Sequence, residues 1–156
     1  MKKRFLAALT GCIVAISGIS AFAAAKTIVL DGTAAEIPAD MGSIKEMDDR
    51  TFVPVRFVSE KLGCTVKYNA IKMNDTLQEN VTITDKNNVS YLMTKGENML
   101  YIIPASGNGS VIKMDTAVFI DEAEGRTYIP IRFLAQALGY EVGWDEAAET
   151  VSLTAK

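Results

Sequence analysis

The sequence predicts an α+β fold in which antiparallel β-sheets pack on two short α-helices, with one strand–helix–strand–strand unit occurring twice. The main observation is a phrase that is written twice, RTFVPVRFVSEKLG from Arg50 and RTYIPIRFLAQALG from Arg126. Within each copy, a short amphipathic segment lies between a proline and a glycine, which favours a short helix. Outside the copies, apolar and polar residues alternate between turn signals, which is typical of β-strands.

The N-terminal residues predict a secretory signal peptide over residues 1–25. A basic Lys-Lys-Arg head precedes residues 5–25, which carry no charge and end in small residues. A basic head, an apolar run and an Ala-x-Ala ending are the three parts of such a signal. Cleavage after Ala23 or after Ala25 fits equally well, so residues 26–156 form the predicted mature chain.

Two other interpretations of this segment stay open. The run of 21 uncharged residues is long enough to span a bilayer as an uncleaved anchor, although glycines and serines dilute it. Leu9-Thr10-Gly11-Cys12 resembles a bacterial lipobox, which would place a lipid on Cys12. Only a short apolar stretch precedes this motif and the apolar run continues beyond it, so a cleaved signal is the prediction.

The charge of the predicted mature chain excludes some classes of partner. Removal of the signal lowers the basic residues from 16 to 13 against 19 acidic residues, which gives a net charge of −6. An acidic chain argues against a nucleic-acid partner, and against membrane binding by charge after signal cleavage. Cys64 is then the single cysteine, so we expect no internal disulfide and a buried apolar role for this side chain. Residues 26–156 are enough for one domain with its own core.

Segments rich in β-branched residues predict the strands outside the helices. Asp31-Gly32 and residues 106–110 provide hairpin turns between them. Residues 70–78 are expected to form a loop, about six residues longer than its counterpart near Ala147 and Ala148. The predicted strands are residues 27–30, 34–37, 65–68, 81–84, 89–94, 99–103, 111–114, 117–120, 141–144 and 151–154.

The two copies predict the same local structure. With an offset of 76, eight of 21 positions are identical between residues 50–70 and 126–146. A short strand is followed by a proline that suits the first position of a helix, and a glycine suits the helix end. Apolar residues at spacings of three and four, such as Val55, Val58 and Leu62, form the buried helix face. The positions of this repeated structural motif are Arg50, Thr51, Pro54, Arg56, Leu62, Gly63, Arg126, Thr127, Pro130, Arg132, Leu138 and Gly139.

The second arginine of each copy, Arg56 or Arg132, is the one repeated residue without an evident folding role. It lies in the first turn of its helix, where the helix dipole disfavours a cation. We therefore expect a carboxylate from a neighbouring loop to compensate the charge. The candidates are Asp48, Asp49, Asp145 and Glu146. The alternative is that the two arginines bind an anionic ligand.

The repeated phrase, followed by V-x-[YW]-[ND] and a V-T-[IL]-T type strand, resembles the copper amine oxidase N-terminal-like domain, also called the stalk domain. Family members usually carry the phrase twice in one domain, and the resemblance covers residues 26–154. Asp48-Asp49 stands where the family commonly has Asn-Gly, and residues 70–78 are longer than usual. These departures affect loops and leave the expected fold unchanged.

The resemblance implies an exported module of Gram-positive-type bacteria, often associated with the cell envelope, with no established ligand. In the enzyme that gave the family its name, this domain is an appendage without chemistry, and the copper lies in a separate catalytic domain. No cofactor is therefore expected. The sequence contains no histidine, which independently argues against a copper or zinc site.

Two residue groups carry the remaining hypotheses about chemistry. Tyr68 and Trp144, at equivalent positions of the two copies, are candidates with Tyr91 and Tyr101 for a platform that stacks on glycan rings. The alternative is that these aromatic residues lie in the core or form cross-strand pairs. Ser110 and Lys113 match the S-x-x-K pattern of serine hydrolases, but the surrounding alternation predicts a strand where that chemistry uses a helix.

The sequence thus predicts a non-catalytic, exported stalk-type domain that acts as an extracellular or cell-envelope structural or interaction module. Its partner would be an unknown protein or a cell-wall polymer. The alternative function is binding of cell-wall glycan, either peptidoglycan or polysaccharide. A third class is a hydrolase that uses Ser110 and Lys113.

Overall fold

The computed structural model of the protein describes residues 27–145 and 147–156. The predicted signal peptide, with Cys12, and Glu146 lie outside the described residues. The described part is built mostly of antiparallel sheets with two short helices, which confirms the α+β class. Among the helices of these residues, none combines the length and the apolar composition that a membrane span requires.

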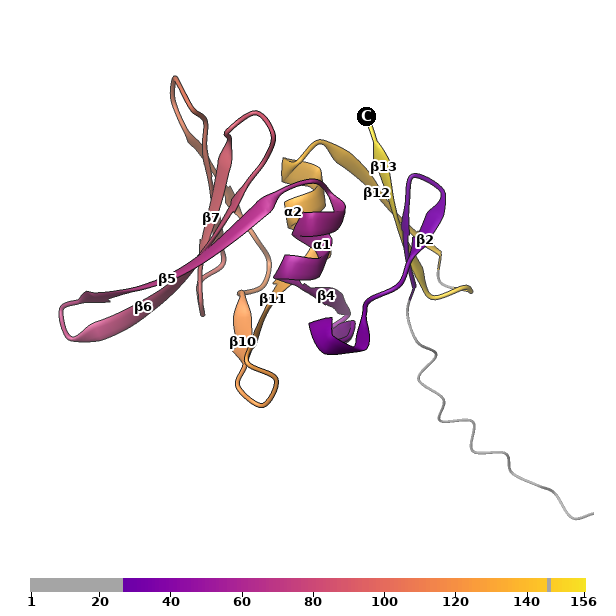
Figure 1. Cartoon of the computed structure of the whole chain (residues 1–156), viewed down its shortest axis with the longest axis horizontal. Coiled ribbons are helices and arrows are strands. Elements are labelled where there is room, and N and C mark those ends of the chain that lie inside the picture. The colour runs from indigo at the N-terminus through magenta and orange to yellow at the C-terminus, as the bar shows by residue number, and fades with distance from the viewer. Residues whose placement is uncertain (1–26, 146) are drawn as a thin grey trace, which may run out of the picture.

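The strands form three sheets. A five-stranded antiparallel sheet has the order β5-β6-β7-β8-β9, a central sheet has the order β10-β11-β4-β3, and a terminal sheet has the order β12-β13-β1-β2. The two helices lie between the five-stranded sheet on the left and the terminal sheet on the right (Figure 1). Helix α1 contacts β4, β5 and β11, and helix α2 contacts β4, β11 and β12.

The bounds of the elements are as follows. The terminal sheet contains β1 (Thr27–Leu30), β2 (Thr33–Ala35), β12 (Tyr140–Asp145) and β13 (Thr150–Ala155). The central sheet contains β3 (Lys45–Met47), β4 (Arg50–Pro54), β10 (Phe119–Asp121) and β11 (Arg126–Pro130). The five-stranded sheet contains β5 (Thr65–Met73), β6 (Thr76–Thr84), β7 (Ser90–Thr94), β8 (Met99–Ile103) and β9 (Ser110–Lys113). The helices are α1 (Val55–Lys61), α2 (Ile131–Ala137) and the 3-10 helix η1 (Ala39–Met41).

Each copy of the repeated phrase forms a strand and a helix, and a hairpin follows it. The two first strands pair antiparallel across the central sheet, with Val53 opposite Ile129. Each proline is the N-cap residue of its helix in extended conformation, one position earlier than the sequence predicts. The glycines after the helices have positive φ angles, +74° at Gly63 and +87° at Gly139, and both donate a backbone hydrogen bond to the last helical turn.

The helices bury the faces that their spacing predicts. Val55 and Val58 of α1, and Ile131 and Leu134 of α2, are almost completely buried between the sheets. They belong to one core cluster that includes Ile83, Met93 and Leu100 of the five-stranded sheet and Ile28, Val151 and Leu153 of the terminal sheet. Cys64 is also buried there, and burial raises the pKa of its thiol, as expected for an apolar role.

Two predictions about the strands are wrong. Residues 70–78 are not a loop, because β5 and β6 continue in register to Met73 and Thr76 around a tight turn at Asn74 and Asp75. Both turn residues have positive φ angles, which matches the handedness of a two-residue hairpin. This extended hairpin, called the arm below, reaches away from the helices (Figure 1). In addition, β1 pairs with β13 in parallel, so the terminal sheet is mixed.

Candidate functional site

The first arginines of the two copies make equivalent local contacts. Arg50 Nη1 donates to the backbone carbonyl of Asp48, and Arg126 Nη1 donates to that of Glu124 at 3.0 Å. Arg126 Nη2 also donates to the carbonyl of Asp40 in η1. Each arginine therefore closes the turn that precedes its own strand.

The second arginine of the second copy has a carboxylate partner that the sequence did not predict. Asp115, in the loop between β9 and β10, lies 3.0 Å from Arg132 Nη2 and 3.1 Å from Arg50 Nε. The hydrogen bond from Arg50 is the largest influence that lowers the pKa of the Asp115 carboxyl. Of the predicted candidates, Asp145 instead accepts a hydrogen bond from the Ala148 amide. One carboxylate thus links the first strand of one copy to the helix of the other.

The second arginine of the first copy, Arg56, is placed differently. Its guanidinium carbon lies 5.8 Å from the ring centroid of Tyr68 on β5. Among the described residues, no carboxylate lies within ion-pair distance of Arg56. The prediction of Asp48 and Asp49 as partners is wrong, because Arg132 pairs with Asp115 and neither aspartate pairs with a second arginine among the described residues.

The aromatic residues of the predicted platform do not gather in one place. Tyr68 lies in the five-stranded sheet and Trp144 in the terminal sheet. Each is paired with a buried valine, so both rings lie on the core-facing side of their sheets, with exposed fractions of 45% and 48%. Tyr91 is only 4% exposed and contacts Asp85 through its hydroxyl, so it cannot serve as a platform.

The first platform residue, Tyr68, lies at the junction of two hollows that we call the groove. The larger hollow has a volume of about 560 Å³ and the smaller one about 280 Å³. Both are lined by Tyr68, Glu79, Ile120 and Thr127. The larger hollow extends past Arg56 at the start of α1 to η1, and the smaller one extends along the arm to Lys95. Trp144 lines neither hollow.

An ion-pair bridge joins side chains that line the two hollows. Lys95 Nζ lies 2.7 Å from a carboxylate oxygen of Glu79 on β6 and 2.7 Å from one of Glu122 in the β10–β11 turn. The hydrogen bonds that Lys95 donates to Glu122 and Glu79 raise the pKa of its ammonium. The arm and the β10–β11 hairpin, which are distant in sequence, are thereby tied together across the groove.

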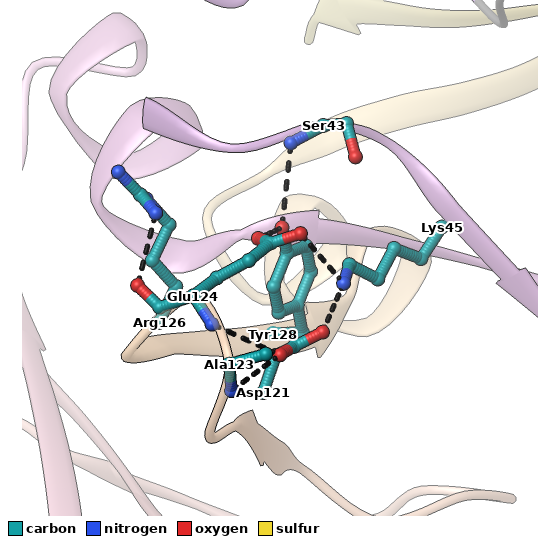
Figure 2. Close-up of polar contacts among 7 residues, drawn as sticks. All are labelled: Ser43, Lys45, Asp121, Ala123, Glu124, Arg126 and Tyr128. Atoms are coloured by element: carbon teal, nitrogen blue, oxygen red, sulfur yellow. Dashed lines mark hydrogen bonds and ion pairs between the residues drawn. The ribbon is translucent and has the colours of Figure 1, made fainter. Parts of the chain in front are cut away.

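A polar network fixes the other wall of the groove. Figure 2 shows Lys45 of β3 directed toward Asp121 and Glu124, with the hydroxyl of Tyr128 donating to Glu124. Asp121 also accepts hydrogen bonds from the amides of Ala123 and Glu124, at 3.0 and 3.1 Å. The hydrogen bond from Tyr128, followed by that from Lys45, lowers the pKa of Glu124. These groups hold the β10–β11 turn that forms the groove rim.

The hydrolase hypothesis is not supported by the geometry. Ser110 and Lys113 both lie on β9, where they pair with Ile102 and Met99 of β8. Because the two residues are three positions apart on one strand, their side chains lie on opposite faces of the sheet. Within residues 27–145 and 147–156, no group of three or more His, Cys, Asp and Glu residues is arranged to hold a metal ion.

The family assignment rests on a match over most of the chain and not on the candidate site. The family model of the copper amine oxidase N-terminal domain matches residues 29–153, which include both copies of the phrase and strands of all three sheets. The chain belongs to the copper amine oxidase N-terminal domain family. In copper amine oxidases, this N-terminal domain is non-catalytic. The comparisons of this chain with curated proteins and with solved structures found no match.

The groove could not be found from the sequence. Its lining comes from η1, the start of α1, the arm and the β10–β11 hairpin, which lie up to 87 residues apart between Asp40 and Thr127. The one available signal was the pair of aromatic residues at equivalent repeat positions. That signal found Tyr68, but it did not distinguish Tyr68 from Trp144.

Proposed function

We propose that this copper amine oxidase N-terminal domain is exported and acts without catalysis, as a structural or interaction module outside the cell or in the cell envelope. The family match over residues 29–153 is the observation that carries the proposal. The predicted signal at residues 1–25 supports export. The partner is an unknown protein or a cell-wall polymer.

The contacts of the repeated residues support an architectural role for the phrase. Arg50, Arg126 and Arg132 are engaged by neighbouring carbonyl or carboxylate oxygens, and both prolines cap helices. These contacts use the polar groups of the phrase within the protein itself. Arg56 is the exception, because it faces the groove.

The proposal includes an internal duplication of the strand–helix–strand–strand unit within one domain of residues 26–156. The offset of 76, the pairing of β4 with β11 and the equivalent arginine contacts support it. If residues 26–156 form one domain, calorimetry will give a single cooperative unfolding transition. Two separate transitions would contradict the single-domain proposal.

The direct test is fractionation of the native host, with mass spectrometry of the N-terminus of the protein in each fraction. Export by a cleaved signal predicts a chain that begins after Ala23 or Ala25, in the medium or the envelope fraction. An intact N-terminus on cytosolic protein would contradict the proposal. A lipid on Cys12 or a retained apolar segment would still place the protein outside, but would replace the cleaved signal with an anchor.

The alternative function is binding of cell-wall glycan, and the exposed rings of Tyr68 and Trp144 favour it. Purified cell wall would be incubated with the protein and sedimented, with a wall stripped of its polysaccharides as the control. Trp144 is the single tryptophan, so its fluorescence reports directly on its own surroundings. Binding without a change in Trp144 emission would assign the interaction to another face.

A further inference from the structure

We propose that the groove binds a short stretch of an uncharged glycan, with the ring of Tyr68 as the platform beneath one sugar. The inference rests on the proposed function, because it names the ligand class of the interaction module. Tyr68 lines both hollows, so a chain that lies along the groove must pass over it. Its exposed ring supplies an apolar surface for the C–H face of a sugar.

The polar lining favours an uncharged ligand over a charged one. The carboxylates, which can only accept hydrogen bonds, are Asp40, Glu79, Glu122 and Glu124. The cations, which can only donate, are Arg56, Arg126 and Lys95. The charges of this lining nearly balance, with four carboxylates against three cations, so it offers little net attraction to a ligand of either sign. A sugar hydroxyl both donates and accepts, so it can form hydrogen bonds with either kind of group.

Arg56 holds the platform in place. Its guanidinium lies against the Tyr68 ring at 5.8 Å, a distance at which a cation and an aromatic ring attract each other. The equivalent Arg132 is neutralised by Asp115, whereas Arg56 has no carboxylate partner among the described residues. Arg56 therefore has donors available for ligand hydroxyls, and it acts on the platform as a positioning residue.

The size and shape of the groove fit several sugar units. Its larger hollow falls within the roughly 300–1,000 Å³ of small-molecule sites. The smaller hollow continues from it past Tyr68 and ends near Lys95, so the groove is longer than one sugar. Amides that can both donate and accept, Asn69 and Asn80, line this continuation.

Calorimetric titration of the full chain tests the inference with four tetrasaccharide probes. Cellotetraose and the tetramer of N-acetylglucosamine are uncharged, the tetramer of galacturonic acid is anionic, and that of glucosamine is cationic. We expect at least one uncharged probe to bind about tenfold more tightly than both charged probes. Tighter binding of a charged probe, or no binding of either uncharged probe, would overturn the inference.

Matched variants locate the binding. Tyr68→Ala should weaken binding about tenfold, as expected for loss of one stacking ring. Tyr101→Ala removes a similarly exposed tyrosine from the outer face of the same sheet, so it should change affinity less than about twofold. Circular dichroism confirms that both variants are folded. If Tyr101→Ala or Trp144→Ala lowers the affinity and Tyr68→Ala does not, the assignment of the site to the groove is wrong.

The same variants separate this inference from the proposed function. If Tyr68→Ala still binds the native cell envelope as the unchanged chain does, the interaction module stands and the groove assignment is wrong. If the unchanged chain does not bind the envelope while the tetrasaccharide binds at Tyr68, the groove assignment stands and the proposed function is wrong.

Discussion

Gly42 shows how tightly one residue is constrained at the base of the central sheet. Its φ and ψ angles are +99° and −156°, a region that is essentially restricted to glycine. A Cβ atom at this position would lie 2.6 Å from the Tyr128 hydroxyl and 3.2 Å from Cγ of Pro54. The hydroxyl cannot easily move, because it is bound to Glu124 and to the Ser43 amide.

Gly42→Ala is therefore expected to lower the free energy of unfolding by about 1–3 kcal/mol from backbone strain, with a further loss from the clash. Gly107→Ala is the matched control, because Gly107 has a φ of +90° but no atom within 4 Å of the added Cβ. Urea denaturation measures both variants. Equal losses would show that the contact with Tyr128 is unimportant.

The carboxylate of Asp115 is expected to stabilise the contact between the two copies. Asp115→Asn should lower the free energy of unfolding by about 0.5–1 kcal/mol, because exposed ion pairs are screened by solvent. Asp75→Asn removes the same charge from the exposed Lys72–Asp75 pair at the arm tip, and it should have a smaller effect. Urea denaturation at low salt compares the two. An equal or larger loss for Asp75→Asn would contradict the role of Asp115.

The two helices are short elements that depend on packing rather than on their own stability. Seven residues are too few for an isolated helix in water, so burial between sheets must stabilise each one. Leu134→Ala, at a side chain that is 1% exposed, should cost about 2–5 kcal/mol. Gln136→Ala, on the exposed side of the same helix, is the control and should be nearly neutral. Thermal unfolding of both variants tests whether burial of the predicted helix face stabilises the protein.

The sequence predicted most elements because their signals are local. The strands at Thr27–Leu30 and Met99–Ile103 have the predicted bounds, and both helices lie between their proline and glycine. Strand β3 was missed because Lys45-Glu46-Met47 is short and polar. It forms because β4 offers a partner edge. The sequence predicts a loop in place of the arm, because Asn74 and Asp75 are turn-forming residues.

The contacts that join distant segments of the chain could not be predicted from the sequence. The parallel pairing of β1 with β13 brings together residues more than 120 positions apart, such as Thr27 and Thr150. No local pattern encodes that pairing. The same holds for Asp115, whose two arginine partners come from different copies. The groove depends on several such contacts, so the sequence alone indicates only its aromatic residue, Tyr68.

The pKa shifts predict how stability varies with pH. The carboxyls of Asp115, Asp121 and Glu124 have lowered pKa values in the folded protein, chiefly because of hydrogen bonds from Arg50, Lys45 and Tyr128, respectively. Their contribution is fully present above the unfolded pKa values of about 4, and it is lost as the pH falls through the lower folded values.

Tyr91 is one of the groups that lower stability at alkaline pH. Burial raises the pKa of its hydroxyl to about 12, so its contribution is present below the unfolded value of about 10 and is lost as the pH rises toward 12. Melting temperatures measured from pH 2 to pH 12 should therefore fall at both ends. The acid fall should be smaller in Asp115→Asn. An unchanged acid fall in that variant would contradict the contribution of Asp115.

We propose that the repeated phrase builds the frame of the domain and that the groove beside Tyr68 contacts the partner. Chemical-shift mapping tests it most directly, with ¹⁵N-labelled protein titrated with solubilised cell-wall glycan from the native host. We expect the largest shifts at residues that line the groove, such as Tyr68, Asn69, Asn80 and Thr127. Shifts confined to Trp144 or to the outer face around Tyr101, or no shifts at all, would contradict it.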